Sequence, residues 1–222
     1  LGLANIIIKD KLYDAQFIKG HTDLPLLVRM DTLKLLKPQE IIKDYQPKVL
    51  KNTQLLKEGQ KPASNLKQTR QVTSEKLRLE WGDFVVWSLD KNGPEVISRD
   101  DSGKAGNFAL EGEFTVKILE DEKVNPVRDT SNLTDSTIVS NGVKVRPVFD
   151  LIKEHVSHFT PEVTSDICNC DKDALVWLAQ EIAKNKAQTL VPVGMGPNHF
   201  FNNDLKDRAI FLVCALTKNI GF

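Results

Sequence analysis

The sequence is poor in cysteine, with 3 thiols in 222 residues, and this shortage excludes a disulfide framework. Cys168 and Cys170 flank Asn169, and Cys214 stands apart. A zinc or iron–sulfur site would need further ligands at suitable spacing, and the neighbouring sequence supplies none. We therefore interpret the cysteines as structural or surface thiols.

The chain also lacks an excess of charge of either sign, because 30 basic and 30 acidic residues cancel. Without a long like-charged block, an electrostatic footprint for nucleic acid is not supported. No apolar run approaches the roughly 18 residues that a membrane span needs. The apolar start, Leu1 to Ile8, leads into charged residues without a small-residue cleavage site, so it does not resemble a signal peptide.

The first residue is not methionine, and the sequence opens in what reads as the middle of a helix. It ends one residue after a predicted turn at Gly221. We expect an internal fragment of a longer protein, with a mature processed protein as the alternative. A chain of 222 residues can bury one or two cores.

The most informative stretch runs from Thr189 to Phe222. The short apolar run over 189–193 predicts a buried strand, and Gly194 to Pro197 predicts a turn after it. Apolar residues at three- and four-residue spacing between Leu205 and Leu216 predict a helix, with N-cap candidates at 202–204. Ligands of open α/β sheets lie beyond strand ends, so 194–199 is a candidate ligand loop. A purely structural turn is the alternative, since the third glycine of a dinucleotide fingerprint is missing.

The stretch GMGPNHFFNNDLKDRAIFLVCALTKNIG resembles the cofactor-binding segment of molybdopterin oxidoreductases of the dimethyl sulfoxide reductase superfamily. It is most similar to catalytic (alpha) subunits of nitrite oxidoreductase and respiratory nitrate reductase. In them a G-x-G-x-N-H loop precedes a helix that ends in an L-T-x-N-I-G turn, here 216–221. Many relatives carry glycine where Lys218 stands.

The segment HTDLPLLVR, from His21 to Arg29, admits two interpretations. A histidine, a carboxylate and an arginine in one turn could form a small polar site. Alternatively, Thr22 and Asp23 cap local backbone before Pro25, which the chemistry favours. The longer pattern H-T-D-L-P-x-L-V-R-x-D-T resembles nitrite oxidoreductases and related nitrate reductases, and it favours that branch over formate dehydrogenases or dimethyl sulfoxide reductases.

The sequence pattern and the resemblance together divide the chain into three regions. In residues 1–36 the pattern predicts a helix or helix pair that stops at Gly20, and the resemblance implies that this region is the helical part of an α/β cofactor-binding domain. Residues 37–145 are predicted to be a loop-rich, solvent-facing excursion with a small antiparallel β insertion. Residues 146–222 are predicted to contain helices and the strand–loop–helix segment.

The helices and strands inside these regions have local signals. We expect strands over 82–88, 95–100, 111–119 and 142–145, and helices over 148–158, from Pro161 and over 173–184. Thr160 is the predicted N-cap of the second helix. The β insertion is expected to have its core at three aromatic residues, Phe84, Trp87 and Phe114.

His155 and His158 stand three residues apart on one helical face. A metal pair is conceivable, but no carboxylate or further histidine is placed to complete it. We interpret both as exposed histidines at a helix end, and we expect no metal ligand in this chain.

The resemblance implies an α/β fold in which a Rossmann-like sheet has flanking helices, as part of a larger multidomain subunit. It implies Mo-bis(molybdopterin guanine dinucleotide) as cofactor, with an iron–sulfur cluster in a missing amino-terminal part. No catalytic residue is expected in this piece. The residues implied to bind the cofactor are Gly194, Met195, Gly196, Pro197, Asn198, His199 and Asn219.

The implied reaction interconverts nitrite and nitrate by oxygen-atom transfer, with a small oxyanion as substrate. The implied partners are an iron–sulfur electron-transfer (beta) subunit and a haem (gamma) subunit, in a peripheral membrane-associated or periplasmic complex. Two alternatives stay open. One is a sister molybdoenzyme acting on chlorate, selenate or ethylbenzene; the other is a catalytically inactive α/β binding or assembly module.

Overall fold

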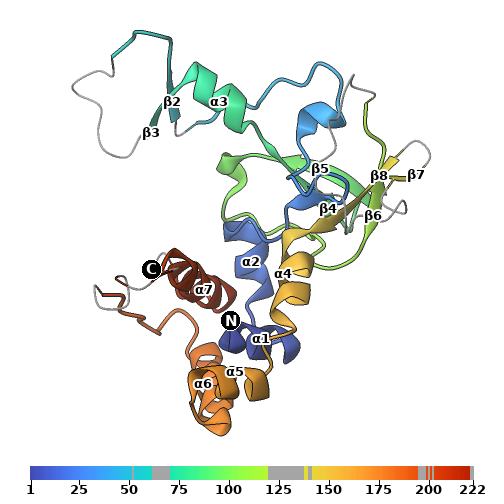
Figure 1. The fold of residues 1–222 in the computed structure, drawn as a ribbon. Helices are drawn as coiled ribbons and strands as arrows, with labels where there is room; N and C mark the ends of the chain where they lie inside the picture. Colours follow the sequence, from blue (N-terminus) through green and yellow to red (C-terminus); the bar gives the residue numbers. More distant parts are fainter. Residues whose placement is uncertain are drawn as a thin grey trace. The chain divides into compact units, whose positions relative to one another are not determined.

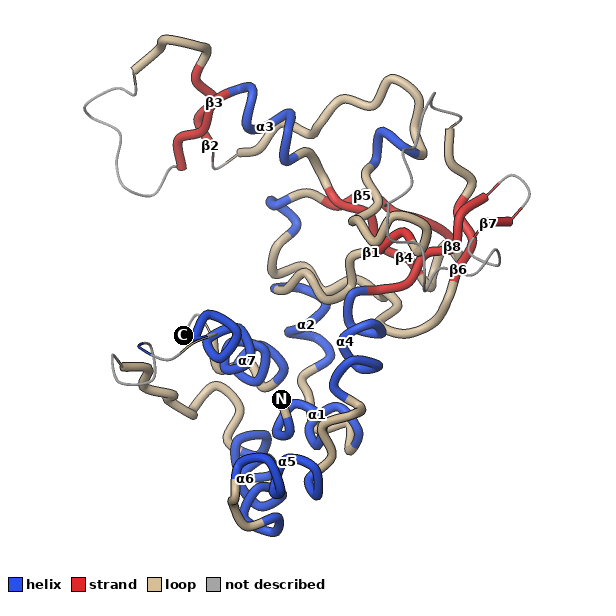
Figure 2. Tube along the Cα trace, viewed as in Figure 1, coloured by secondary structure: helices blue, strands red, loops and turns tan. Residues whose placement is uncertain are grey.

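The computed structural model describes residues 1–51, 53–61, 71–119, 138–139, 142–194, 199, 201 and 203–220. The chain forms two compact units: Leu1–Leu24 with Phe149–Phe222, and Pro25–Val148. The described residues have a mixed α/β composition, and all their strands lie in the second unit (Figure 2). We call the first the helical unit and the second the β unit.

The helical unit joins the two ends of the chain. Its helices are α1 (Gly2–Lys9), α2 (Ala15–His21), α4 (Val148–Val156), α5 (Pro161–Cys168), α6 (Lys172–Lys184) and α7 (Asn203–Leu216). Helix α1 contacts α5, α6 and α7 (Figure 1). Its residues Ala4 to Ile8 are all buried. A helix that is apolar on nearly every side must be enclosed by other elements, and here helices from the far end of the sequence enclose it.

Side-chain caps begin three of these helices. Asp14 accepts a hydrogen bond from the amide of Phe17 at 2.9 Å, and Asp171 accepts one from Ala174 at 2.8 Å. The predicted N-cap of α5 is confirmed, because the Thr160 hydroxyl accepts from the amide of Val163. These caps satisfy amides of the first helical turn that have no partner within the helix.

Helices predicted over 148–158, from Pro161 and over 173–184 correspond to α4, α5 and α6. The predicted stop at Gly20 is wrong, since α2 continues through it to His21. Thr22 follows as the C-cap: its backbone is extended, and its hydroxyl donates to the carbonyl of Ile18 at 2.7 Å.

The strands of the β unit are β1 (Leu27–Arg29), β2 (Thr53–Leu56), β3 (Gln71–Ser74), β4 (Phe84–Ser88), β5 (Gly93–Ile97), β6 (Phe114–Val116), β7 (Ile138–Val139) and β8 (Gly142–Pro147). The unit also contains α3 (Glu75–Trp81) and the short 3-10 helices η1 (Pro38–Glu40) and η2 (Arg99–Asp101). Strand β8 pairs antiparallel with β1, β6 and β7. Strands β4 and β5 form an antiparallel hairpin, and β2 pairs parallel with β3.

The core of the β unit lies between the β8 sheet and the β4–β5 hairpin. Leu27, Val85 and Val145 are at most 1% exposed and belong to one apolar cluster. The ring of Trp87 stacks on Phe114 with centroids 4.2 Å apart, and Phe84 packs on a neighbouring cluster. The prediction that these three aromatic residues belong to the core is therefore confirmed, as is the small antiparallel insertion.

Two expectations about sheets fail. The strand predicted over 189–193 is absent, because Thr189 to Gly194 has no ladder partner and Pro192 removes one amide. Leu190 is 88% exposed, so this apolar run is not buried as a central strand would be. The described residues also contain no Rossmann-like sheet. The three-part division of the sequence stays a prediction.

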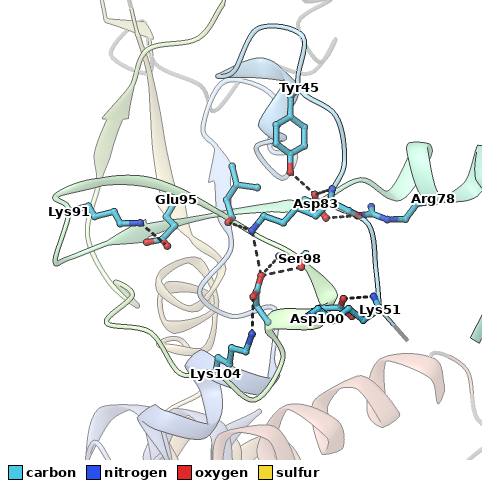
Figure 3. Close-up of polar contacts among 12 residues, drawn as sticks. Tyr45, Lys51, Arg78, Asp83, Lys91, Glu95, Ser98, Asp100 and Lys104 are labelled. Carbon is cyan, nitrogen blue, oxygen red and sulfur yellow. Dashed lines mark hydrogen bonds and ion pairs between the residues drawn. The ribbon is translucent and has the colours of Figure 1, made fainter. Parts of the chain in front are cut away.

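A buried ion pair connects α3 to the start of β4 (Figure 3). Asp83 is fully buried, and one carboxylate oxygen accepts from the Arg78 guanidinium at 2.7 Å. The other oxygen accepts from the Tyr45 hydroxyl at 2.5 Å and from the amide of Lys48 at 2.8 Å. Burial, followed by the hydrogen bond to Asp83, raises the pKa of Tyr45. Because the buried carboxylate accepts three hydrogen bonds, one of them from a cation, the desolvation cost of its charge is offset.

We expect Asp83→Asn to lower the free energy of unfolding by about 3–5 kcal/mol, because the Arg78 charge then stays buried without an anion. Lys91→Gln is the control. It breaks the Lys91–Glu95 pair, whose lysine is 66% exposed, and should cost under about 1 kcal/mol. Urea unfolding of the 222-residue chain, followed by tryptophan fluorescence, measures both. Equal losses in the two variants would contradict the assigned role of Asp83.

Asp101 is expected to make the stability of the same unit depend on pH. Its pKa lies below the ordinary value of 3.8, chiefly because the carboxylate accepts from the Ser98 amide at 2.9 Å. A carboxyl whose pKa is lower in the folded than in the unfolded state stabilises the folded protein at pH values above its unfolded-state pKa. This contribution to stability is lost as the pH falls through the folded-state pKa.

Asp101→Asn should therefore lower stability at pH 7 and lose less stability than the parent chain as pH falls below about 4. Glu58→Gln is the matched control, because Glu58 is exposed and makes no hydrogen bond or ion pair in the described part of the chain. Chemical unfolding at stepwise lower pH tests this. Parallel stability curves for Asp101→Asn and the parent would refute it.

Candidate cofactor-binding site

The candidate ligand loop connects α6 to α7 in the helical unit. Gly194 and His199 are exposed, whereas 195–198, which include Met195, Gly196, Pro197 and Asn198, lie outside the described residues. A Cβ added at Gly194 would meet no heavy atom within 4 Å. The backbone there can therefore be approached closely by another molecule.

Asn219 anchors the beginning of this loop. Its Oδ1 accepts from the amide of Thr189 at 3.0 Å, and its Nδ2 donates to the Thr217 hydroxyl at 2.8 Å. The fully buried Thr217 donates in turn to the carbonyl of Val213 at 2.8 Å. Two segments 30 residues apart in sequence are thereby joined, and both contain residues predicted to bind a ligand. Sequence reasoning missed Thr189, since nothing in its local pattern indicates this long-range contact.

The turn after α7 needs a left-handed residue. Lys218 has φ +60°, and the amide of Asn219 donates to the carbonyl of Cys214 at 2.8 Å. Glycine adopts this conformation without steric cost, which explains why glycine suits this position. For lysine this backbone conformation is sterically unfavourable, so the turn that positions Asn219 is formed at some cost in stability.

An apolar groove of about 570 Å³ is lined by residues 189–192, which lead into the candidate loop. Its walls come from α1, α6 and α7 and from residues 189–192. Leu178, Leu190 and Ile210 contribute apolar surface, and Lys206 is its one charged lining residue among those described. The groove can accommodate the apolar face of a ligand or protein segment.

The HTDLPLLVR segment begins in the helical unit and ends in the β unit, where Arg29 has its ion-pair partners. The buried Arg29 pairs with Asp31 at 2.6 Å and with Glu40 in the β unit, and the hydrogen bond to Asp31 is the main cause of its raised pKa. Thr22 instead accepts from the amide of Leu24 at 3.2 Å. The capping interpretation is confirmed for Thr22 but not for Asp23, whose side chain makes no hydrogen bond among the described residues.

The thiols and helix-end histidines are scattered. Cys168 is exposed, Cys170 is half-buried, and burial raises the pKa of the Cys214 thiol. His155 and His158 are exposed, as predicted.

Among the described residues no group of three or more His, Cys, Asp or Glu side chains could hold a metal ion. No described helix has both the length and the apolar character that crossing a membrane requires.

Comparison with known proteins shows similarity over the whole chain, although no family model matches it. The chain is 27% identical over 221 residues to the respiratory nitrate reductase subunit alpha of Haloferax mediterranei, covering 100% of this chain and 18% of that protein. It is 27% identical over 232 residues to the perchlorate reductase subunit alpha of Dechloromonas aromatica, covering 100% and 21%. The chlorate reductase subunit alpha of Ideonella dechloratans is 25% identical over 206 residues, covering 89% and 16%.

Along its own full length, the chain is distantly similar to alpha subunits of the dimethyl sulfoxide reductase family. It spans about a fifth of the length of these curated relatives. The similarity covers both units, so the family resemblance does not rest on the G-M-G-P-N-H loop alone.

The left-handed conformation of Lys218 leads to a prediction about stability, which does not depend on whether the turn binds a ligand. Lys218→Val should lower the free energy of unfolding by about 1–2 kcal/mol, because a β-branched side chain disfavours positive φ. Lys218→Gly, the residue with free access to this conformation, should be neutral or stabilising. Thermal and urea unfolding compare the pair. If valine were tolerated as well as glycine, the assigned turn geometry would be wrong.

Proposed function

We propose that this chain is part of the catalytic subunit of a molybdopterin oxidoreductase that interconverts nitrite and nitrate by oxygen-atom transfer. The observation that carries the proposal is the full-chain similarity to the alpha subunits of respiratory nitrate reductase and perchlorate reductase. The HTDLPLLVR and GMGPNH segments support the nitrite and nitrate branch.

The cofactor of this proposal is Mo-bis(molybdopterin guanine dinucleotide), and the described residues are compatible with it. Gly194 faces open space, and His199 is exposed with no polar partner among the described residues. The Asn219 amide retains one N–H and one lone pair after its two internal hydrogen bonds.

In this proposal the chain's role is binding. The residues that would hold the cofactor are Gly194, Met195, Gly196, Pro197, Asn198, His199 and Asn219. Backbone amides and the Asn198 and His199 side chains donate hydrogen bonds to polar edges or phosphates. The bound cofactor supplies the redox and oxygen-transfer chemistry, and no residue of this chain is assigned a catalytic step.

The wider architecture is also proposed from the family. In the full subunit the helical unit flanks a Rossmann-like sheet, an arrangement supported by exposed apolar residues such as Trp177 (61%) and Leu190 (88%). An iron–sulfur cluster occupies another part of the subunit. An iron–sulfur beta subunit and a haem gamma subunit complete a membrane-associated or periplasmic complex.

A second candidate is an enzyme that acts on an oxyanion of chlorine. The similarity to perchlorate and chlorate reductase alpha subunits, at 27% and 25% identity, favours it over the other sister activities. Reduction of nitrate, chlorate and perchlorate by the intact complex, compared under identical conditions with one electron donor, separates the two candidates.

The direct test is to isolate the native polypeptide that carries GMGPNHFFNNDLK and measure its mass and molybdenum content. A large subunit that contains molybdenum is expected. A stable chain close to 24.9 kDa without molybdenum would overturn the enzyme proposal and favour a binding or assembly module.

The cofactor loop is tested in the full-length subunit with His199→Ala. Loss of a hydrogen bond to an anionic or strongly polar group should lower molybdenum and guanine content at limiting cofactor by about tenfold. His158→Ala removes another exposed histidine of the helical unit and should leave both contents unchanged. Equal contents in the two variants would exclude His199 from cofactor binding.

A further inference from the structure

A second cavity of the helical unit is distinct in chemistry from the groove lined by residues 189–192. It has a volume of about 760 Å³, and its lining residues come mainly from the end of α2, from α4 and from α7. Figure 1 shows these three helices in the helical unit. Its apolar surface includes Leu24, Ile152 and Leu212. This volume is within the range of small-molecule sites.

Four ionisable side chains line this cavity: His21, Asp23, His155 and Arg208. His21 stacks on Phe17 with centroids 4.9 Å apart, and the His155 ring lies 5.9 Å from that of Phe159. These ring contacts orient the imidazoles without using their nitrogen atoms.

All four residues are exposed, and none of their side chains makes a hydrogen bond or ion pair within the part of the chain that the structure describes. Their polar atoms are therefore available to a ligand, unlike those of the buried Arg29 and Arg78, which each bind a carboxylate. A guanidinium carries a planar set of donors that matches a carboxylate, so an arginine without a partner at an apolar cavity can bind an anion. One of the two sequence-based interpretations grouped His21 and Asp23 with Arg29, and within the helical unit both residues line the same cavity as Arg208.

We propose that this cavity binds a small organic monoanion, in which one carboxylate is attached to a planar apolar body. Arg208 pairs with the carboxylate, and the two imidazoles supply further N–H donors. The apolar body lies against the aliphatic wall. The Asp23 carboxylate weakens the binding of more highly charged anions by repulsion. This proposal does not depend on the oxidoreductase function.

Benzoate and its neutral isostere benzamide test the proposal on the 222-residue chain. The chain has 4 histidines, which makes their ring resonances resolvable by NMR. Benzoate should shift His21 and His155, while His158 and His199, which do not line the cavity, act as internal references. Benzamide should bind at least about tenfold more weakly, because the charge-assisted hydrogen bond is lost.

Two substitutions with opposite expected effects on benzoate affinity distinguish a change in binding from a folding defect. Arg208→Gln should weaken benzoate binding about tenfold or more, whereas Asp23→Asn should tighten it by about two- to fivefold. Arg99→Gln removes an exposed arginine of the β unit and should leave the affinity unchanged. Equal binding of benzoate and benzamide, unchanged affinity in Arg208→Gln, or uniform shifts of all histidines would each overturn the proposal.

Discussion

The helical unit depends on the enclosure of α1. Ala4 and Ile7 have no exposed surface, and Asn5 donates its side-chain amide to the carbonyl of Val156 at 2.9 Å, at the end of α4. An apolar helix of this kind cannot remain in water, so α5, α6 and α7 have to close around it. The first and last parts of the sequence are thereby held together, and the ends of the candidate loop between α6 and α7 are held with them.

In the β unit, buried charged side chains hold separate segments of the chain together. Irregular segments there contain few large apolar residues, and they are fastened by carboxylates that accept several donors each. Asp83 connects Tyr45 and Lys48 to Arg78, while Arg29 connects Asp31 to Glu40. Such pairs are costly to break, because the charge that remains is buried without a partner. Both the paired strands and the buried polar contacts therefore stabilise this unit.

The helical unit contains two places where a ligand could be held. The candidate cofactor loop is anchored through Thr189 and Asn219, and it presents an exposed backbone at Gly194. The other place is the cavity at Arg208, where charged groups without partners surround apolar surface. The two differ in chemistry: the first offers backbone and amide donors, and the second offers a guanidinium. Each can therefore select a ligand without depending on the other.

Local physical chemistry made much of the secondary structure predictable from sequence. The helix beginning at Pro161 with Thr160 as its cap depends on neighbouring residues and was predicted correctly, as was a strand over the residues of β4. The strand predicted over 95–100 is shifted: β5 covers Gly93–Ile97, and η2 begins at Arg99. Whether 189–193 forms a strand depends on a partner elsewhere, so its composition could not decide the outcome. The same holds for Arg29 and Arg208: sequence shows two arginines, but only packing decides that one is buried against carboxylates while the other faces a cavity. Caps and periodicity act over a few residues, whereas burial and charge pairing act between segments that only the tertiary structure brings together.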